Sequence, residues 1–255
     1  MALFTDGPLT TSSELQQYEN NILNVASTEN IDITVKARLA QDEIATDLLL
    51  FFDRNSLWDP RLLVRKLIRL ADVVSTEPLK RWHVYRTLAM VYEDAYNNQL
   101  NDRYQGKWTQ YEQLSNDAAQ KLFRVGVGIV HDPIPKAPVP SLSTVPLGVT
   151  GNSYYVCTSW VGALGQEGTV SDAEQATSID GSAVVVGVSG PPSSAVSWNV
   201  YAGSAPENVT LQNTSPLSIK ATWMLPASGL CSGRTPGSGQ VPECWIVDRR
   251  ILLRG

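Results

Sequence analysis

The sequence predicts a multidomain protein of α and β type, in which an N-terminal all-α helical bundle with one long helix precedes a C-terminal antiparallel β-sandwich. The chain has 255 residues, which suits two domains better than one. Charged residues number 32 in the first 133 positions and 13 in the remaining 122. Glycine and proline together rise from 8 in the first part to 25 in the second. Because both residues interrupt helices and serve turns, the first part is expected to be helical and the second β.

The same shift in composition sets the expected domain boundaries. The helical domain is predicted over residues 1–130 and the sandwich over 147–255, with a proline-rich linker over 131–146. The linker begins HDPIPKAPVP, where proline alternates with other residues. Such a pattern favours an extended, polyproline-like spacer that holds two modules apart.

Apolar spacing predicts three shorter helices in the first domain. A first stripe, capped by Ser12 or Ser13, consists of Leu15, Tyr18, Ile22 and Val25. A second helix runs from about Asp32 to Asp53, and its buried side is expected to hold Val35, Leu39, Ile44, Leu48, Phe51 and Phe52. Asp59 and Pro60 resemble an N-cap followed by a first-turn proline, so a third helix is expected from Arg61 to Val74.

A fourth helical pattern dominates the domain and extends from about Thr76 to Arg124. Gly106 is the only glycine in it, so the pattern fits either one helix of about 70 Å or two helices bent at Gly106. A small domain cannot bury so long an element alone, and neighbouring subunits are the expected source of cover. The predicted intersubunit face consists of Trp82, Tyr85, Tyr92, Tyr96, Tyr104, Trp108 and Tyr111.

Short β-prone runs separated by turn signals follow the linker. They are predicted at 153–161, 183–188, 196–202, 209–211, 221–224 and near 245–253. In the third run, Trp198 and Val200 are expected to face one way, and Asn199 and Tyr201 the other. The segment from Cys231 to Gln240 is interpreted as a mobile loop. An immunoglobulin-like sandwich accounts for this spacing, while a barrel or a jelly roll stays open.

No residue pattern predicts an enzyme, a cofactor or a metal site. The two histidines, His83 and His131, lie in the helical part, whereas Cys157, Cys231 and Cys244 all lie in the other. A nucleophile–histidine pairing and a zinc site are therefore not expected, and the thiols are expected to stay reduced. The phosphate-loop and dinucleotide-binding patterns are absent from the sequence.

Charge and hydropathy exclude further classes. A net charge of −5 and a pI near 5.1 argue against a broadly basic surface that coats nucleic acid. No apolar run of membrane-spanning length and no secretory signal occur, so the protein is expected to stay in the cytoplasm where it is made. A cluster of cations is interpreted as a solvated helix face and comprises Arg61, Arg65, Lys66 and Arg69.

Several segments resemble proteins of tailed bacteriophages. Four segments of the second half are similar to fibronectin-type-III or immunoglobulin-like modules of phage structural proteins. They are WNVYAG at 198–203, the stretch at 206–213 with its proline and Leu-Gln-Asn, Ser-Pro-Leu at 215–217, and TWMLPASGL at 222–230. The helical half, with YEDAYNNQLNDRYQGKW at 92–108, resembles a head-to-tail connector (adaptor) subunit. The resemblance implies a ring of twelve copies between the portal and the tail or tail-terminator proteins, in the neck of a virion assembled in the host cytoplasm. DNA passes through such a ring without sequence-specific binding.

The end of the chain is expected to dock on a partner such as the portal. The docking tail mixes cations with aliphatic residues and comprises Arg249, Arg250, Ile251, Leu252, Leu253 and Arg254. An ordinary edge strand is the competing interpretation of these residues.

Two other functions fit the sequence. The chain is alternatively a neck-fibre, baseplate or tail-fibre attachment protein, whose sandwich binds a host surface or another virion protein. Exposed aromatic residues on the sandwich would favour that role, and Trp160 and Trp223 are the candidates. A cellular adhesion or scaffolding protein is the other alternative.

Overall fold

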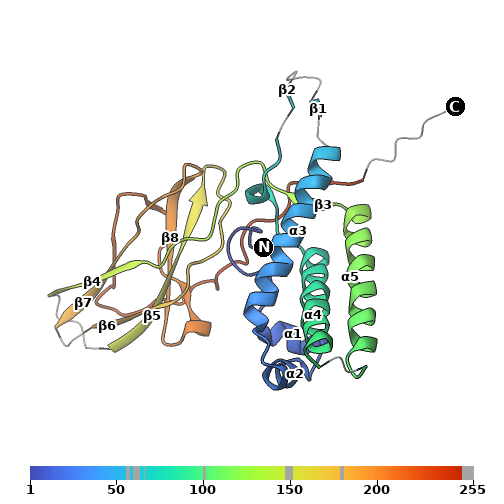
Figure 1. Cartoon of the computed structure of the whole chain (residues 1–255). Coiled ribbons are helices and arrows are strands. Elements are labelled where there is room, and N and C mark those ends of the chain that lie inside the picture. Colours follow the sequence, from blue (N-terminus) through green and yellow to red (C-terminus); the bar gives the residue numbers. More distant parts are fainter. Residues whose placement is uncertain are drawn as a thin grey trace. The chain divides into compact units, whose positions relative to one another are not determined.

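The computed structural model describes residues 1–55, 58–59, 64–65, 67–99, 102–146, 152–178 and 181–248. These residues form five α-helices in the N-terminal half and antiparallel β-sheets in the C-terminal half, which confirms the mixed α and β composition predicted for the two halves (Figure 1). None of the described helices is long and apolar enough to cross a membrane.

The chain divides into two compact units that do not coincide with its two halves. The helical unit comprises 7–130 and 242–255, and the β unit comprises 1–6 and 131–241. The chain passes from the helical unit to the β unit between residues 130 and 131. The structure differs from the prediction at both ends of the chain, because each unit takes a terminal segment from the opposite end.

The helical unit contains α1 to α5. Their bounds are α1 (Ser12–Tyr18), α2 (Ile22–Glu29), α3 (Ile33–Arg54), α4 (Glu77–Gln99) and α5 (Gln105–Val125). Thr11, not Ser12 or Ser13, caps α1 through a reciprocal box with Glu14, and Asp32 caps α3 by accepting hydrogen bonds from two backbone amides. Figure 1 shows α3, α4 and α5 side by side, and α4 packs against both of the others.

The buried face of α3 differs from the predicted one. Ile44, Leu48 and the two phenylalanines are buried as expected, and Ile33, Ala37 and Ala40 complete the inner face. Val35 and Leu39 are 39% and 41% exposed, so their predicted burial is wrong. Alanine at 37 and 40 lets the helix approach its neighbours on that side, which turns the larger Val35 and Leu39 outward.

The helix predicted from Arg61 to Val74 is replaced by short extended segments. Strands β1 (Trp58–Asp59) and β2 (Val64–Arg65) pair antiparallel, and a 3₁₀ turn, η1 (Leu70–Asp72), follows. Residues 60–63 and 66 lie outside the described residues. Val74 donates a backbone hydrogen bond to Gly128 in β3 (Val127–Ile129), and Val130 donates one to Asp72. A β-branched segment that pairs with a buried strand favours the extended conformation over a helix.

Strand β12 (Cys244–Ile246) also pairs with β3, so the last predicted strand belongs to the helical unit. The pairing is antiparallel and places Trp245 opposite Gly128. A Cβ at Gly128 would lie 2.7 Å from the Pro242 ring, so only glycine permits this approach without movement. The predicted sandwich boundary at residue 255 is corrected to 241 by this contact.

The β unit contains two antiparallel sheets around one apolar core. The first has the order β10-β8-β5-β6 with β9 beside β8, and the second has the order β11-β7-β4. The strands are β4 (Ser141–Pro146), β5 (Asn152–Gly162), β6 (Glu174–Ser178), β7 (Ser182–Gly187), β8 (Ala195–Gly203), β9 (Thr210–Leu211), β10 (Leu217–Ser218) and β11 (Trp223–Met224). Trp160, Trp198, Val184 and Trp223 belong to the shared core.

The proline-rich stretch is part of the β unit and not a free spacer. Ile134 and Ala137 are 1% and 3% exposed and join the core, and β4 pairs with β7 along its whole length. The prolines keep this stretch extended, and extension allows alternate side chains to point into the core. Segment 1–6 packs here too, because Asp6 accepts hydrogen bonds from the Lys136 amide and from the Thr169 hydroxyl.

Candidate functional site

The predicted intersubunit stripe lies inside the helical unit. Residues 102–104 form a turn between α4 and α5, so the long pattern is two helices packed against each other. The Tyr92 ring stacks 5.6 Å from Tyr111 and lies 6.1 Å from Tyr104, and Tyr96 stacks 5.7 Å from Trp108. Each of Tyr92, Tyr104 and Tyr111 is at most 5% exposed in the single chain.

The other two members of the stripe are also covered from within the chain. Trp82 is 4% exposed and meets the Phe123 ring edge-on, while the half-buried Tyr85 packs near Tyr18 and Tyr111. The structure therefore corrects the prediction that one chain cannot cover this surface. The helical hairpin doubles the stripe back on itself, and aromatic residues of α4 and α5 cover one another.

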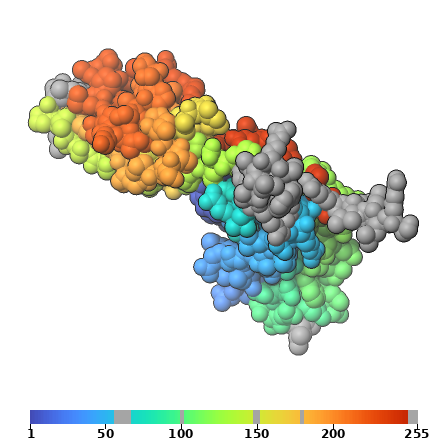
Figure 2. Space-filling model, turned by 90° about the horizontal axis from the view of Figure 1, so that it is seen from above, coloured from blue at the N-terminus to red at the C-terminus, as the bar shows by residue number. Residues whose placement is uncertain are grey.

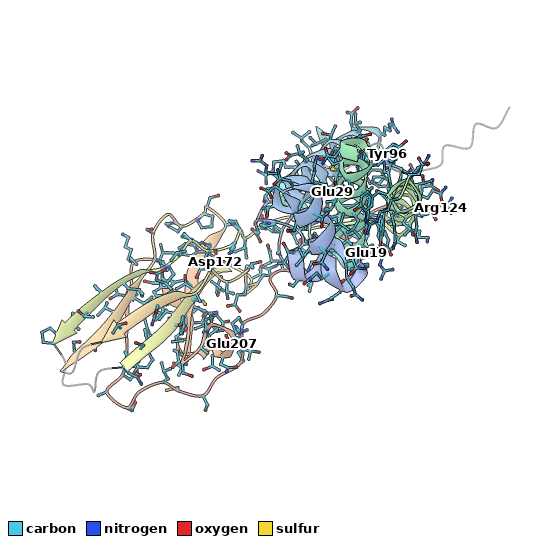
Figure 3. All side chains as sticks on the ribbon, turned by 60° about the horizontal axis from the view of Figure 1, so that its bottom comes forward. Glu19, Glu29, Tyr96, Arg124, Asp172 and Glu207 are labelled. Atoms are coloured by element: carbon cyan, nitrogen blue, oxygen red, sulfur yellow. The ribbon has the colours of Figure 1, made fainter. Side chains whose placement is uncertain are left out.

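Two carboxylates, the buried Glu29 and the partly buried Glu19, bind this aromatic core to the N-terminal helices. Glu19 accepts hydrogen bonds from Lys107 at 2.5 Å and from the Tyr111 hydroxyl at 2.7 Å. Glu29 accepts one from the Tyr104 hydroxyl at 3.0 Å. Figure 3 labels Glu19 and Glu29 on the helical unit, with Tyr96 on α4.

These contacts perturb the titration of both partners. Burial alone would raise the pKa of Glu19, but the hydrogen bonds from Lys107 and Tyr111 outweigh it and lower that pKa. Burial, followed by the hydrogen bond to Glu19, raises the pKa of Tyr111. Burial and the nearby Glu19 carboxylate raise the pKa of Tyr92 to about 12. Tyr111 is therefore neutral near pH 7 and donates its hydroxyl hydrogen to Glu19.

A polar groove of about 220 Å³ lies between α3 and α5, with α4 as its floor. Arg86 on the floor donates to Glu43 of α3 at 2.5 Å and to Glu112 of α5 at 2.9 Å. Burial and the nearby Glu43 raise the pKa of Asp47 on the groove wall, although Arg86 opposes the shift. Side chains of Glu43 and Glu112 are 48% and 42% exposed, so these ion pairs orient the helices more than they stabilise them.

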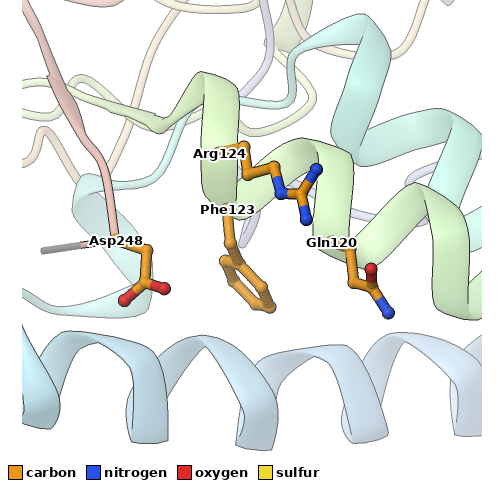
Figure 4. Close-up of a pocket in the computed structure, with 4 residues that line it drawn as sticks. All are labelled: Gln120, Phe123, Arg124 and Asp248. Atoms are coloured by element: carbon orange, nitrogen blue, oxygen red, sulfur yellow. The ribbon is translucent and has the colours of Figure 1, made fainter. Parts of the chain in front are cut away.

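A larger hollow of about 640 Å³ opens at the C-terminal end of α5. Gln120, Phe123, Arg124 and Asp248 line it, and the Asp248 amide donates to the Phe123 carbonyl at 3.0 Å (Figure 4). Figure 4 shows the Phe123 ring extending from α5 toward α3, where it stacks 4.5 Å from Phe51. All six residues of the predicted docking tail, 249–254, lie outside the described residues.

His83 has a structural environment. The ring is 0% exposed and lies between the Thr10 hydroxyl and the Ala37 carbonyl, each 2.8 Å from a ring nitrogen. Burial lowers the pKa of His83, against the opposing effect of the Ala37 hydrogen bond. Of the predicted cationic cluster, Arg69 pairs with Asp72 at 2.8 Å, and its side chain is 63% exposed. Arg61 and Lys66 lie outside the described residues.

The most elaborate polar cluster lies in the β unit and centres on Glu167, a residue that the sequence analysis missed. Its Oε1 accepts hydrogen bonds from the Ser159 hydroxyl, from Asn199 Nδ2 at 3.0 Å and from the Tyr201 hydroxyl at 2.6 Å. Its Oε2 accepts one from Arg234 at 2.6 Å. The Glu167 side chain is only 13% exposed.

The strand alternation predicted at β8 explains how this cluster forms. Trp198 and Val200 enter the core between the sheets, whereas Asn199 and Tyr201 point to the opposite face, as predicted. Burial alone would raise the pKa of Glu167, but the hydrogen bonds from Asn199, Ser159, Tyr201 and Arg234 outweigh it and lower that pKa. The carboxylate is thus ionised and fully partnered, which suits a structural role better than proton transfer.

The segment predicted as a mobile loop is held against this face of the sheet. The Leu211 amide donates to the Arg234 carbonyl at 2.9 Å, and Gln212 exchanges hydrogen bonds with Cys231. Gln240 accepts from the Ile134 amide at 2.7 Å. The interpretation of 231–240 as mobile is therefore wrong, because its glycines allow close backbone contact as well as flexibility.

The two aromatic residues named as candidates for an exposed binding surface are buried. Trp160 is 1% and Trp223 is 7% exposed, and both belong to the core between the sheets. Cys157 is buried, Cys231 is exposed and Cys244 is half-buried. Among the described residues, no group of three or more His, Cys, Asp or Glu side chains is arranged to hold a metal ion.

Comparison with known proteins gives no family. No protein-family model matches the chain, and no curated protein matches it.

Proposed function

We propose that the chain is a structural virion protein, a head-to-tail connector (adaptor) subunit of a tailed bacteriophage that forms a ring between the portal and the tail. The proposal rests on the resemblance of both halves to phage structural proteins and on the exchange of terminal segments between the two units. Buried polar groups in both units hold segments together, and their described environments contain no open carboxylate–nucleophile arrangement.

The exchange of terminal segments between the units carries the proposal. Segment 1–6 completes the β unit, and β12 completes the helical unit by pairing with β3. Three chain crossings therefore connect the units, after residues 6, 130 and 241. To separate them, segment 1–6 must leave the β unit, where Asp6 accepts hydrogen bonds from the Lys136 amide and the Thr169 hydroxyl, and β12 must detach from β3. Such a construction resists force, and a connector through which DNA passes under pressure must resist it.

We further infer that the two sheets form an immunoglobulin- or fibronectin-like sandwich displayed outward from the ring. Support comes from antiparallel pairing throughout both sheets and from a single core between them that contains three tryptophans. Figure 3 labels Asp172 and Glu207 on this unit, and both are exposed.

The test is the mass of the assembly in solution. Light scattering of the purified protein across a range of concentrations, alone and with the portal protein, is expected to give a ring-sized assembly, and electron microscopy is expected to show closed rings. A 27.8 kDa species that remains monomeric alone and with the portal would contradict the connector function.

A specific observation favours the alternative attachment function. A hollow of about 270 Å³ lies between β4, β6 and β7. Its lining is partly polar and comprises Leu142, Ser143, Thr144, Gln175, Ala176, Thr177 and Val184. Hydroxyl and amide groups of this kind suit a polar ligand, such as the carbohydrate of a host surface or a loop of another virion protein. Binding of purified host surface glycans by the wild type, lost in Gln175→Ala and retained in Glu207→Ala, would favour attachment over the connector function.

A further inference from the structure

The outward face of α3 has an organised apolar stripe that the helical unit does not cover. We define the outer face of α3 by residues at steps of 4, 3, 4, 3 and 4 along the helix. Its members are Val35, Leu39, Asp42, Thr46, Leu49 and Asp53, with Leu50 beside them. Exposed fractions of the four aliphatic side chains are 39% for Val35, 41% for Leu39, 47% for Leu49 and 52% for Leu50. In Figure 2 residues of α3, coloured blue, lie at the surface of the helical unit.

The spacing is that of a helix–helix contact. Alternating steps of 3 and 4 bring residues onto one narrow line of a helix, as at the seam of a coiled coil. The opposite face of α3 already holds the core through Ile33, Ala37, Ala40 and Ile44, so the outer face is a second seam. It runs from residue 35 to residue 53, about 27 Å along the axis.

We infer that this seam docks on the same seam of a second copy of the chain, with the two helices antiparallel. The steps read the same in both directions. In an antiparallel pair with its two-fold axis at Ile44, Leu39 of one copy therefore lies opposite Leu49 of the other, and Asp42 lies opposite Thr46. Such self-complementarity is what a two-fold contact requires.

Charge selects the antiparallel arrangement. A parallel pair would place Asp42 against Asp42 and Asp53 against Asp53, whereas the antiparallel pair places Asp42 beside a threonine hydroxyl. In the same register Arg38, which is exposed, lies opposite Leu50, and Val35 lies opposite Asp53. Antiparallel helices also align their dipoles favourably.

The exposed face of the neighbouring helix α5 complements the leucines poorly. The outward face of α5 is amide-rich, with Gln110, Gln113, Asn116 and Gln120 all exposed, and it offers no apolar partner for Leu39 and Leu49. The seam contains four aliphatic side chains per copy, fewer than a standard interface has. The dimer is accordingly weak, with an expected dissociation constant of about 10–500 μM. A two-fold contact closes at two copies, so the dimer is independent of the proposed ring.

Two charge variants at one position test the contact by sedimentation equilibrium of the full chain. Thr46→Lys places a cation opposite Asp42 twice in the dimer and is expected to tighten association about threefold to tenfold. Thr46→Glu places an anion there and is expected to weaken association by a similar factor. Position 46 is exposed in the single chain, and circular dichroism checks that both variants fold. Equal effects of the two charges, or a wild type that is monomeric at 1 mM, would overturn the inference.

Disulfide trapping tests the register. In a background with Cys231→Ser and Cys244→Ser, a mixture of Leu39→Cys and Leu49→Cys chains is expected to cross-link on mild oxidation, whereas Leu39→Cys alone is not. Two copies of residue 39 would be about 15 Å apart along the antiparallel pair, beyond the reach of a disulfide. A mixture of Gln113→Cys and Gln120→Cys on α5 is the matched control and is expected to stay uncross-linked.

Other results would overturn the inference. Cross-linking of Leu39→Cys with itself would indicate a parallel or different contact. Dimers that form only after deletion of residues 249–255 would show that the chain's own end occupies the seam. Rings that form without the 39–49 cross-link would contradict the dimer but not the connector function. A 39–49 cross-link without rings would support the dimer and contradict the connector function.

Discussion

Replacing Glu167 by alanine is expected to destabilise the β unit strongly. The change removes the common acceptor of Ser159, Asn199 and Tyr201, which are all buried at 4% exposure or less. An orphaned buried donor costs about 1–3 kcal/mol, but the serine hydroxyl rotates and water enters beside the half-exposed Arg234. The expected loss is therefore about 3–5 kcal/mol, in the range found when a buried ion pair loses one partner.

The assay is native-state hydrogen exchange of amides in β5 and β8, because it reports the free energy of opening within the β unit. Peptides of α4 and α5 in the same sample are the internal reference. Glu207→Ala is the matched control, since Glu207 is exposed and a change there is expected to stay within about 0.5 kcal/mol. A loss below about 1 kcal/mol for Glu167→Ala, or one equal to that of the control, would refute the reasoning.

The pH dependence adds a second readout. The folded pKa of Glu167 is lowered, so its ionised form contributes stability above the ordinary value of 4.5, and the contribution is lost as pH falls through the folded pKa. Wild type is therefore expected to lose β-unit stability in this acid window more steeply than Glu167→Gln. Parallel curves for the two proteins below pH 4.5 would contradict this assignment.

Three further predictions concern the helical unit. The pKa of buried His83 is lowered, so as pH falls the unfolded chain binds a proton at this histidine before the folded chain does. The free energy of unfolding is therefore expected to fall below pH 6.5 by up to about 1.4 kcal/mol per pH unit. Denaturant melts of His83→Gln are expected to lack that slope. Tyr111→Phe removes a donor to Glu19 and is expected to cost about 1–2 kcal/mol in urea melts, whereas no loss would show that Lys107 alone satisfies the carboxylate. Gly128→Ala is expected to lower the stability of the fold by about 1–3 kcal/mol, because the new methyl group forces the Pro242 ring away. Gly106→Ala, which has open space around it on α5, is expected to raise stability by about 0.5–1 kcal/mol. Thermal melts measure both, and equal effects would disprove the close approach at Gly128.

Helical periodicity predicted where the long helices of the first domain lie better than it predicted which surfaces of those helices pack together. The aromatic steps of 3 and 4 persist from Trp82 to Tyr111 whether the chain runs straight or turns back, because α4 and α5 each need the same inward spacing. The sequence therefore left one helix and two helices open, and the turn at 102–104 decides between them. Leu39 shows a related limit, since a helix with two apolar seams does not reveal which one meets the core.

Non-local contacts account for most of what the sequence could not predict. Glu167 lies between β5 and β6, in an isolated bridge to Val161, and its importance depends on donors from β5, β8 and a segment more than 60 positions away. The exchange of segment 1–6 and β12 between units has no local signature either, because composition describes a window and not its neighbours in space. Only the alternation at Trp198 to Tyr201 gave a correct indication of the face where the Glu167 cluster forms.

The exchanged segments also make the time at which each unit can finish folding depend on the rate of protein synthesis. Segment 1–6 emerges from the ribosome before any of its β partners exists, and β3 waits about 115 residues for β12. At about 5–20 residues per second, β3 keeps an unpaired edge for about 6–23 s while the β unit is made. Neither unit can finish as an independent early domain, so the two become native nearly together, once residues 242–246 have been made.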